Sequence, residues 1–221
     1  GDPVGEEWSR WDTPGRTVYG GSTAAGAFIE VLEYIRPAPP VIAMTDLFDD
    51  VEADDAVTLD EQIAREFPAH GAMPFRSISR GWRQSRRLYE IQLPAEGWFI
   101  DVTGANSVAT INSEQPELLG ALGTEQLTLS ELTNSSPEAR TLTTGIATWI
   151  RESVVLEDGS RPHGITYPSK WGAGLTNWAM WMRRTDDGTG QDPIKTLETA
   201  EIGKHSAALI AAAQLRGFSI F

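Results

Sequence analysis

The sequence predicts an α+β fold, with a mixed β-sheet at its core and helices flanking the sheet. Segments with the two-residue alternation of strands and segments with helical periodicity follow one another along the chain. Their order is too irregular for a doubly wound parallel sheet. The chain has 221 residues, 40% of them hydrophobic, which is enough for one full core. We therefore expect a single domain over residues 1–221, with an acidic insert at about residues 44–66.

The first expected elements are a strand and the helix that follows it. Residues 16–20 are rich in β-forming side chains, and the pair Ser22-Thr23 offers hydroxyl groups for a helix cap. A helix is expected over about residues 24–35, because apolar side chains recur there at helical spacing and prolines follow it. These side chains are Phe28, Val31, Leu32 and Ile35.

The same signals predict the remaining elements. A helix is expected around residues 59–66, and a longer one starts at the cap and proline signal Ser136-Pro137 and ends at Asp158-Gly159. A glycine-rich loop at residues 172–174 is expected between two strands. The full set of further elements is strands at 87–93, 98–102, 164–168 and 177–182, a helix over about 206–215, and a terminal strand at 218–221.

Charge is distributed unevenly along the chain. The net charge is −13, and residues 44–66 hold nine acidic residues against one basic residue, Arg65. We interpret this acidic stretch as a solvated surface, with a docking surface for a basic partner as the alternative. The five arginines that follow are expected to pair with this acidic stretch, and phosphate binding is the alternative. They are Arg76, Arg80, Arg83, Arg86 and Arg87. So acidic a chain repels phosphate backbones, which disfavours general nucleic-acid binding.

Composition excludes several kinds of site. The chain has no cysteine, which removes thiolate metal sites and fits a reducing, cytoplasmic location. Its three histidines are widely scattered, so no metal site is expected. No G-x-x-x-x-G-K-S/T loop occurs, and no G-x-G-x-x-G follows a strand. No apolar run approaches the about 20 residues that a membrane-spanning helix needs, so no membrane partner is expected.

The most informative stretch runs from Arg10 to Glu30. On a helical wheel Glu30 falls nearly opposite the apolar side of its helix, beside the small residue Gly26. Taken alone, this position is typical of a glutamate that faces solvent. The preceding strand delivers Tyr19 near the start of the same helix. An arginine and an aromatic ring on a strand and turn, with a carboxylate on the helix behind, suit an anionic ligand with a flat ring.

This stretch resembles the RES family, bacterial toxins of toxin–antitoxin pairs that destroy NAD. The first block of that family reads R-W-x-x-x-G-x-x-x-Y followed by A-x-x-E-V-L. The matching residues here are Arg10-Trp11, Gly15, Tyr19, Ala27 and Glu30-Val31-Leu32. A later block of the family, a proline–serine after a strand with Asn-Trp downstream, matches Pro168-Ser169 and Asn177-Trp178. The resemblance covers nearly the whole chain, although the acidic insert has no counterpart in the family pattern.

The resemblance implies a fold like that of ADP-ribosyltransferases, with NAD as the substrate and no further cofactor. Arg10 would anchor the dinucleotide, Tyr19 would pack on the nicotinamide ring, and Glu30 would face the adjoining ribose. Ser169 would hydrogen-bond the bound NAD, and Asn177 is a further candidate for binding it. By this implication Arg10 and Glu30 are the catalytic candidates.

Alternatives stay open for both the residues and the function. Tyr19 could be a core residue, and Ser169 could cap a turn after Pro168. Met180, Trp178 and Trp181 are expected in the core. The acceptor of the ribosyl group is either water or phosphate. The competing functions are mono-ADP-ribosyl transfer and a non-catalytic domain that binds a partner. The resemblance also implies a cognate antitoxin protein as a partner.

Overall fold

The computed structural model describes residues 8–35 and 76–221, except 135, 189 and 191, together with residues 58, 61 and 65. The chain forms two compact units. Unit 1 comprises Gly1–Ser22 and Glu90–Leu197, and unit 2 comprises Thr23–Tyr89 and Glu198–Phe221. The expectation of one domain over residues 1–221 stays a prediction.

Unit 1 is built on a four-stranded mixed sheet with the strand order β1-β6-β5-β4. The strands are β1 (Thr17–Gly21), β4 (Phe99–Asp101), β5 (Gly164–Ser169) and β6 (Gly172–Trp181). β6 pairs antiparallel with both β1 and β5, whereas β4 and β5 are parallel. This mixed sheet confirms the α+β class and the strands expected at residues 16–20, 98–102 and 164–168.

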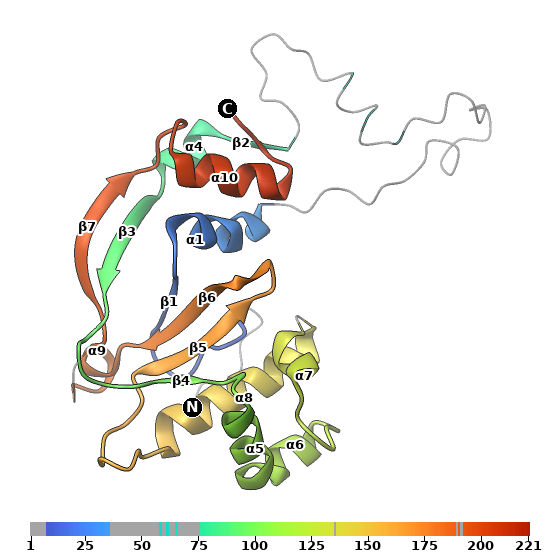
Figure 1. The fold of residues 1–221 in the computed structure, drawn as a ribbon, viewed down its shortest axis with the longest axis vertical. Helices are drawn as coiled ribbons and strands as arrows, with labels where there is room; N and C mark the ends of the chain where they lie inside the picture. Colours follow the sequence, from blue (N-terminus) through green and yellow to red (C-terminus); the bar gives the residue numbers. More distant parts are fainter. Residues whose placement is uncertain are drawn as a thin grey trace. The chain divides into compact units, whose positions relative to one another are not determined.

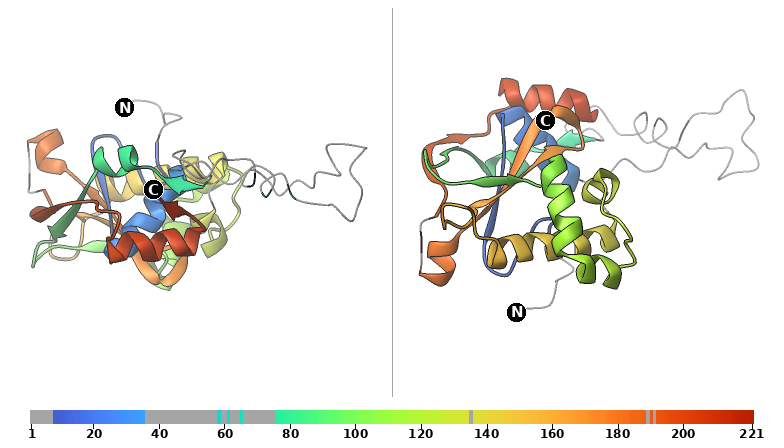
Figure 2. Two further views of the ribbon diagram at one scale, coloured as in Figure 1. Left: turned by 90° about the horizontal axis from the view of Figure 1, so that it is seen from above. Right: turned by 60° about the horizontal axis from the view of Figure 1, so that its bottom comes forward.

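Helices α5–α8 gather on one side of unit 1 (Figures 1 and 2). They are α5 (Ala105–Glu114), α6 (Pro116–Ala121), α7 (Leu129–Thr133) and α8 (Pro137–Ser153). Their apolar side chains form one buried cluster with Ile165, Ala179 and Trp181 of the sheet. Met180 is also fully buried, while Trp178 is half-buried, so the core expected at these strand positions is largely confirmed.

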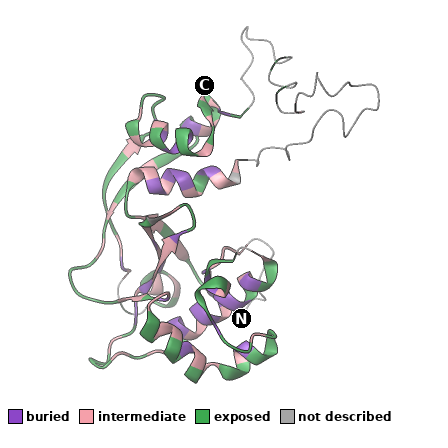
Figure 3. Ribbon diagram, turned by 45° about the vertical axis from the view of Figure 1, so that its right-hand side comes forward, coloured by how far each residue is buried: buried purple, intermediate pink, exposed green. Residues whose placement is uncertain are grey.

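Unit 2 contains a pair of helices that lie side by side, α1 (Ala24–Val31) and α10 (Ala207–Arg216) (Figure 1). Both helices carry buried residues, which include Phe28 and Ile29 on α1 and Leu209 and Ala212 on α10, and Figure 3 colours parts of both helices purple. The other described elements that lie wholly within unit 2 are η1 (Leu32–Tyr34), β2 (Ser77–Ile78), α4 (Arg80–Gln84) and β8 (Ser219–Ile220), with β2 and β8 paired in parallel.

The expected signals mark both ends of these helices. Thr23 caps α1 by accepting a hydrogen bond from the backbone N–H of Gly26 at 3.0 Å. Ser206 caps α10, and Gly217 ends that helix in the left-handed conformation that glycine adopts without strain. The last element expected from the sequence, a strand at residues 218–221, is confirmed as β8.

Two further strands, β3 (Arg87–Gln92) and β7 (Lys195–Glu201), pair with each other, and the division between the units falls within both. β3 confirms the strand expected at residues 87–93. A short helix, α9 (Arg183–Asp187), follows β6 in unit 1. Within the described ranges, no helix is both long enough and apolar enough to cross a membrane.

Two of the expected helices differ from the structure at their ends. The regular helix expected over residues 24–35 gives way at Leu32 to a single 3-10 turn, and Val31, expected on its apolar face, is 40% exposed. The long helix ends at Ser153 rather than at Asp158-Gly159. Arginine side chains satisfy carbonyl groups of its last turn, because Arg183 donates to the carbonyl of Arg151 at 2.6 Å and Arg161 donates to that of Glu152 at 3.1 Å.

The glycine-rich loop expected at residues 172–174 is wrong, because these residues begin β6. The chain reverses one step earlier. Ser169 and Gly172 are register partners, so Lys170 and Trp171 form the connection. The strand expected at residues 177–182 therefore starts at Gly172 and ends at Trp181.

The contacts of the arginines after residue 75 with the acidic stretch lie outside the described residues, so the expected pairing stays a prediction. Buried Arg83 donates to the backbone carbonyls of Ile202 and Phe221. Arg87 pairs with Glu201 at 3.3 Å. The helix expected at residues 59–66 lies mostly outside the described residues, although Thr58 and Glu61 form the reciprocal hydrogen bonds of a helix-capping box.

Candidate functional site

Arg10 lies against two aromatic rings of unit 1. Its guanidinium carbon is 5.5 Å from the ring centre of Tyr167 and 5.6 Å from that of Trp11. The two rings lie 5.6 Å apart and are tilted by 42°. Nη1 of Arg10 also donates a hydrogen bond of 3.0 Å to the carbonyl of Thr133 at the end of α7. Cation–π contact and this hydrogen bond hold the side chain of Arg10 at the edge of the core.

Tyr19 joins the same group through its hydroxyl. The hydroxyl donates to Oδ1 of Asp12 at 2.7 Å and accepts from the backbone N–H of Trp11 at 3.2 Å. Burial, together with the neighbouring Asp12 carboxylate, raises the pKa of Tyr19 well above its usual value. The residue is nevertheless 39% exposed, so part of Tyr19 remains open to solvent.

The register of the sheet places the remaining members on the same face. Residues directly opposite one another on neighbouring strands point to one side of a sheet. Tyr19 is opposite Ala179, and Asn177 lies between Gly21 of β1 and Tyr167 of β5. Because residues two apart on a strand also share a face, Tyr19, Asn177 and Tyr167 point to the side that carries the core. We call Arg10, Trp11, Asp12, Tyr19 and Tyr167 the arginine–aromatic cluster.

Ser169 lies at the end of β5, two residues beyond Tyr167, and is buried. Its hydroxyl oxygen accepts a hydrogen bond of 3.1 Å from the backbone N–H of Trp171, inside the turn that leads to β6. The register shifts between Pro168 and Ser169, so the strand alternation does not extend to this serine. The turn-capping alternative considered for Ser169 is thus seen in the structure.

Glu30 belongs to unit 2, where it lies on α1 and is half-buried. Gly26, one turn earlier, is fully buried, as are Phe28 and Ile29. The structure therefore brings Arg10, Tyr19 and Asn177 together on one sheet face of unit 1, while Glu30 is positioned by the helix pair of unit 2.

A buried arginine fixes the loop between Asp12 and β1. Arg151 of α8 donates to Oγ1 of Thr13 at 3.0 Å, to the carbonyl of Pro14, and to Oδ2 of Asp186 at 3.1 Å. The same Asp186 oxygen accepts from the backbone N–H of Arg16 at 2.6 Å. Gly15, between these contacts, has a φ of +96°, which explains a glycine there.

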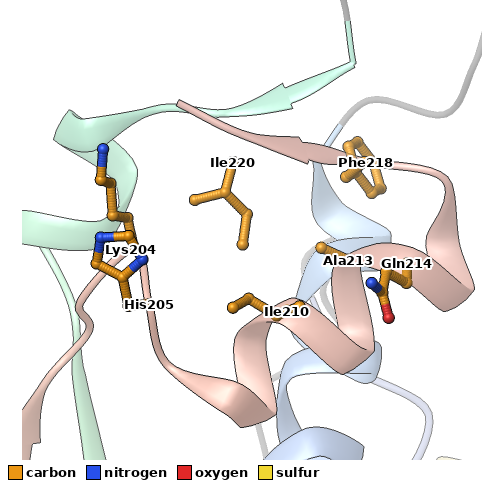
Figure 4. Close-up of a pocket in the computed structure, with 7 residues that line it drawn as sticks. All are labelled: Lys204, His205, Ile210, Ala213, Gln214, Phe218 and Ile220. Carbon is orange, nitrogen blue, oxygen red and sulfur yellow. The ribbon is translucent and has the colours of Figure 1, made fainter.

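A pocket of about 320 Å³ lies elsewhere, in unit 2 between α10, β8 and the segment before α10 (Figure 4). Lys204 and His205 stand at one end of it, Gln214 and Phe218 at the other. Its lining includes none of the five residues expected to act on NAD. The pocket is therefore separate from the site that the sequence predicts.

Sequence reasoning did not assign a role to Asp12 or Tyr167. Asp12 stands inside the first motif block and Tyr167 directly precedes the second, and the alternation of β5 places Tyr167 on the side of the core residue Ile165. That alternation is a signal that could have identified Tyr167. The hydrogen bond from Tyr19 to Asp12 spans seven residues across a turn, and no sequence period encodes it.

The chain matches no model of a known protein family, no curated protein and no solved structure. The structure itself defines a mixed α+β protein in which an arginine, two tyrosines and a tryptophan meet on one sheet face. Such a cluster offers a fixed positive charge beside aromatic surface, which are the features needed to hold an anionic ligand with a planar ring.

Proposed function

We propose that the protein is a toxin-type enzyme of the RES kind that degrades NAD by cleaving the bond between nicotinamide and ribose. The observation that carries the proposal is the arginine–aromatic cluster. NAD combines an anionic pyrophosphate with flat rings, and the cluster presents a guanidinium 5.5 Å from the ring centre of Tyr167, together with a second tyrosine, Tyr19, that is partly exposed. The resemblance of the motif blocks to the RES family supports the same substrate.

Each residue of the cluster has a defined task in this proposal. Arg10 anchors the dinucleotide through its positive charge, and its planar group is already oriented by Tyr167 and Trp11. Tyr19 packs on the nicotinamide ring. Its hydroxyl is engaged by Asp12 and by the N–H of Trp11, which leaves stacking as the main contribution of this side chain. Asn177 and Ser169 supply polar groups for the bound NAD.

The reaction breaks the bond from the ribose carbon to the nicotinamide nitrogen, and the bonding electron pair leaves with nicotinamide. The ribosyl group then carries a positive charge shared with its ring oxygen, as in glycoside cleavage. Glu30, taken from the resemblance, stabilises this charge electrostatically. The ribose carbon forms a new bond to an oxygen of water, which loses a proton, or to an oxygen of phosphate.

The partner and location expected from the sequence follow from this proposal. An enzyme that destroys NAD harms the cell that makes it, so we propose a neutralising antitoxin protein as its partner and the cytoplasm as its place of action. The proposed function assigns no role to the acidic stretch at residues 44–66.

The proposal is tested by following free nicotinamide after NAD is added to the purified chain. We expect the wild type to release nicotinamide and Glu30→Gln to lose on the order of 10²–10³-fold in rate, the scale for one lost electrostatic contact to a transition state. Glu33→Gln, three residues further along the chain, is the matched control and should keep its rate.

The products separate the alternatives within the same experiment. Release that requires phosphate identifies a phosphorylase, and release without phosphate identifies a hydrolase. Labelled ADP-ribose on a protein band would instead show a mono-ADP-ribosyltransferase. Intact NAD after long incubation with the folded chain would overturn the proposal in favour of a non-catalytic binding domain.

A further inference from the structure

We propose that Asp12 is the positioning residue that fixes Arg10 and Tyr19 relative to each other. Its two carboxylate oxygens are used separately. Oδ2 accepts from the backbone N–H of Ser9 at 2.6 Å, and Oδ1 accepts from the hydroxyl of Tyr19 at 2.7 Å. One side chain thereby joins the turn that carries Arg10 to the strand that carries Tyr19.

Two hydrogen bonds between Ser9 and Asp12 close the turn. The N–H of Asp12 donates to the carbonyl of Ser9 at 3.1 Å, while the side chain of Asp12 accepts from the N–H of Ser9. Arg10 and Trp11 are the two residues enclosed by this turn. Their backbone conformation is consequently held by Asp12, and with it the direction in which the Arg10 side chain leaves the chain.

The link to Tyr19 is made twice. Besides the bond to Asp12, the hydroxyl accepts from the N–H of Trp11, a residue inside the turn. Hydrogen bonds to a carboxylate are about twice as strong as those between neutral groups, so the contact with Asp12 is the stronger of the two. A phenol held at both its donor and its acceptor position has little freedom to rotate or shift along the sheet.

Tyr19 is oriented through its hydroxyl, so its ring stays available to a ligand. Asp12 and Trp11 hold the hydroxyl end, and 39% of the residue is still exposed for a ligand to cover. Loss of the Asp12 carboxylate would release the turn and the ring together. Positional errors of about 1 Å at a site can cost roughly 10²-fold in rate, so a residue that touches no substrate can have a large effect.

The inference rests on the proposed function, and its test compares three variants in the full chain. Asp12→Ala removes both contacts of the carboxylate, and Asp12→Asn keeps a side-chain oxygen that can accept. Asp158→Ala is the matched control, because Asp158 also closes a turn, with Ser160, in the same unit. NAD cleavage is measured as kcat and KM. The free energy of unfolding is measured with urea for the same variants, for Tyr19→Phe and for the double variants.

We expect Asp12→Ala to lower kcat/KM by at least ten-fold and Asp158→Ala to have no effect. Asp12→Asn should recover only part of that loss, because its single side-chain oxygen can accept from Ser9 or from Tyr19 but not from both. Adding Asp12→Ala to Tyr19→Phe should cost less than it does in the wild type, because Asp12 acts partly through that hydroxyl. The losses in the free energy of unfolding for the Asp12 and Tyr19 changes should likewise be less than additive.

Equal kcat/KM values for Asp12→Ala and Asp158→Ala would overturn the inference while leaving NAD cleavage in place. Failure of the wild type to cleave NAD would remove the proposed function instead. The unfolding measurements would still decide whether Asp12 holds Tyr19, because additive losses for the Asp12 and Tyr19 changes contradict that contact. Should Asp12→Ala not fold, Asp12→Asn carries the test, and a kcat/KM equal to that of the wild type would overturn the inference.

Discussion

Two aromatic rings and a helix carbonyl define the position of the Arg10 guanidinium. These contacts depend on the shape of the group as well as on its charge. A guanidinium is flat and donates in fixed directions, whereas the ammonium group of lysine is a compact, strongly hydrated charge. Replacing Arg10 by lysine therefore keeps the positive charge and changes the shape of the group that carries it.

Arg10→Lys should raise the KM for NAD by about ten-fold, because stacking on Trp11 and Tyr167 is lost while the positive charge stays. Steady-state kinetics of nicotinamide release measure the change. Arg16→Lys is the control, since the side chain of Arg16 is 72% exposed and its pair with Asp186 spans 3.8 Å. Equal KM values for the two variants would show that the aromatic contacts of Arg10 are irrelevant to binding.

The pKa of Tyr19 predicts how stability depends on pH. Burial and the Asp12 carboxylate keep this phenol protonated in the folded chain beyond pH 10, where an unfolded tyrosine ionises. Above that pH the unfolded state binds fewer protons than the folded state, so the free energy of unfolding must fall as pH rises. Urea unfolding between pH 8 and pH 11 should show a smaller decline in Tyr19→Phe. Tyr89→Phe, at a residue 58% exposed, should behave like the wild type.

At this scale the sequence predicted that an arginine and a tyrosine serve one site, and the structure places Arg10 and Tyr19 within one cluster. It did not predict what holds them. The contacts of Asp12 depend on the side-chain geometry of a single turn, and those of Tyr167 depend on the pairing of β5 with β6. Neither set of contacts can be recognised from the spacing of residue types in the sequence.

At the scale of elements, the loop between Asp12 and β1 is held in place by α8 and α9. Arg151 on α8 and Asp186 on α9 bind each other and the backbone of residues 14 and 16. The side chain of Arg151 is only 5% exposed. Removing one partner of a buried ion pair leaves the other charge uncompensated, which is far more costly than losing a surface pair.

Arg151→Ala should therefore lower the free energy of unfolding by about 3–5 kcal/mol. Arg16→Ala removes the exposed partner of the same Asp186 and should cost about 0–1 kcal/mol. Urea unfolding of the two variants at pH 7 gives both values. A similar loss for both would mean that burial does not distinguish the two ion pairs.

Gly15 gives a second test of this loop. A Cβ at residue 15 would overlap Oδ2 of Asp186 and Nη1 of Arg151, and its φ of +96° disfavours any side chain. Gly15→Ala should lower the free energy of unfolding by at least about 2 kcal/mol. Gly120→Ala, in helix α6, meets no atom within 4 Å and should be neutral or stabilising. Thermal unfolding compares the two, and a neutral Gly15→Ala would contradict the described loop.

Helix starts were predicted better than helix ends and turns. Ser136 and Thr23 cap their helices through local hydrogen bonds that the sequence expresses directly. The end of α8 depends instead on Arg161 and Arg183, which come from later in the chain. The sequence predicts a turn at the glycines of residues 172 and 174, whereas both belong to β6, where its pairing with β5 is irregular.

At the scale of the whole molecule, the predicted α+β class with a mixed sheet is confirmed by the order β1-β6-β5-β4. Two compact units were not expected from the sequence, which lacks a linker-like segment at their boundaries. The boundaries fall at Ser22 and inside β3 and β7, and no change of composition marks a division within a strand. The kinship with the RES family remains a proposal that depends on the order and spacing of a few residues.

The central claim, that this chain consumes NAD, is tested most directly by measuring NAD and nicotinamide together over time with purified wild-type chain. The account predicts that one nicotinamide appears for each NAD lost, and that Arg10→Ala and Glu30→Gln both slow the reaction while remaining folded. Undiminished NAD in the presence of folded wild-type chain, or loss of NAD that neither variant slows, would contradict it.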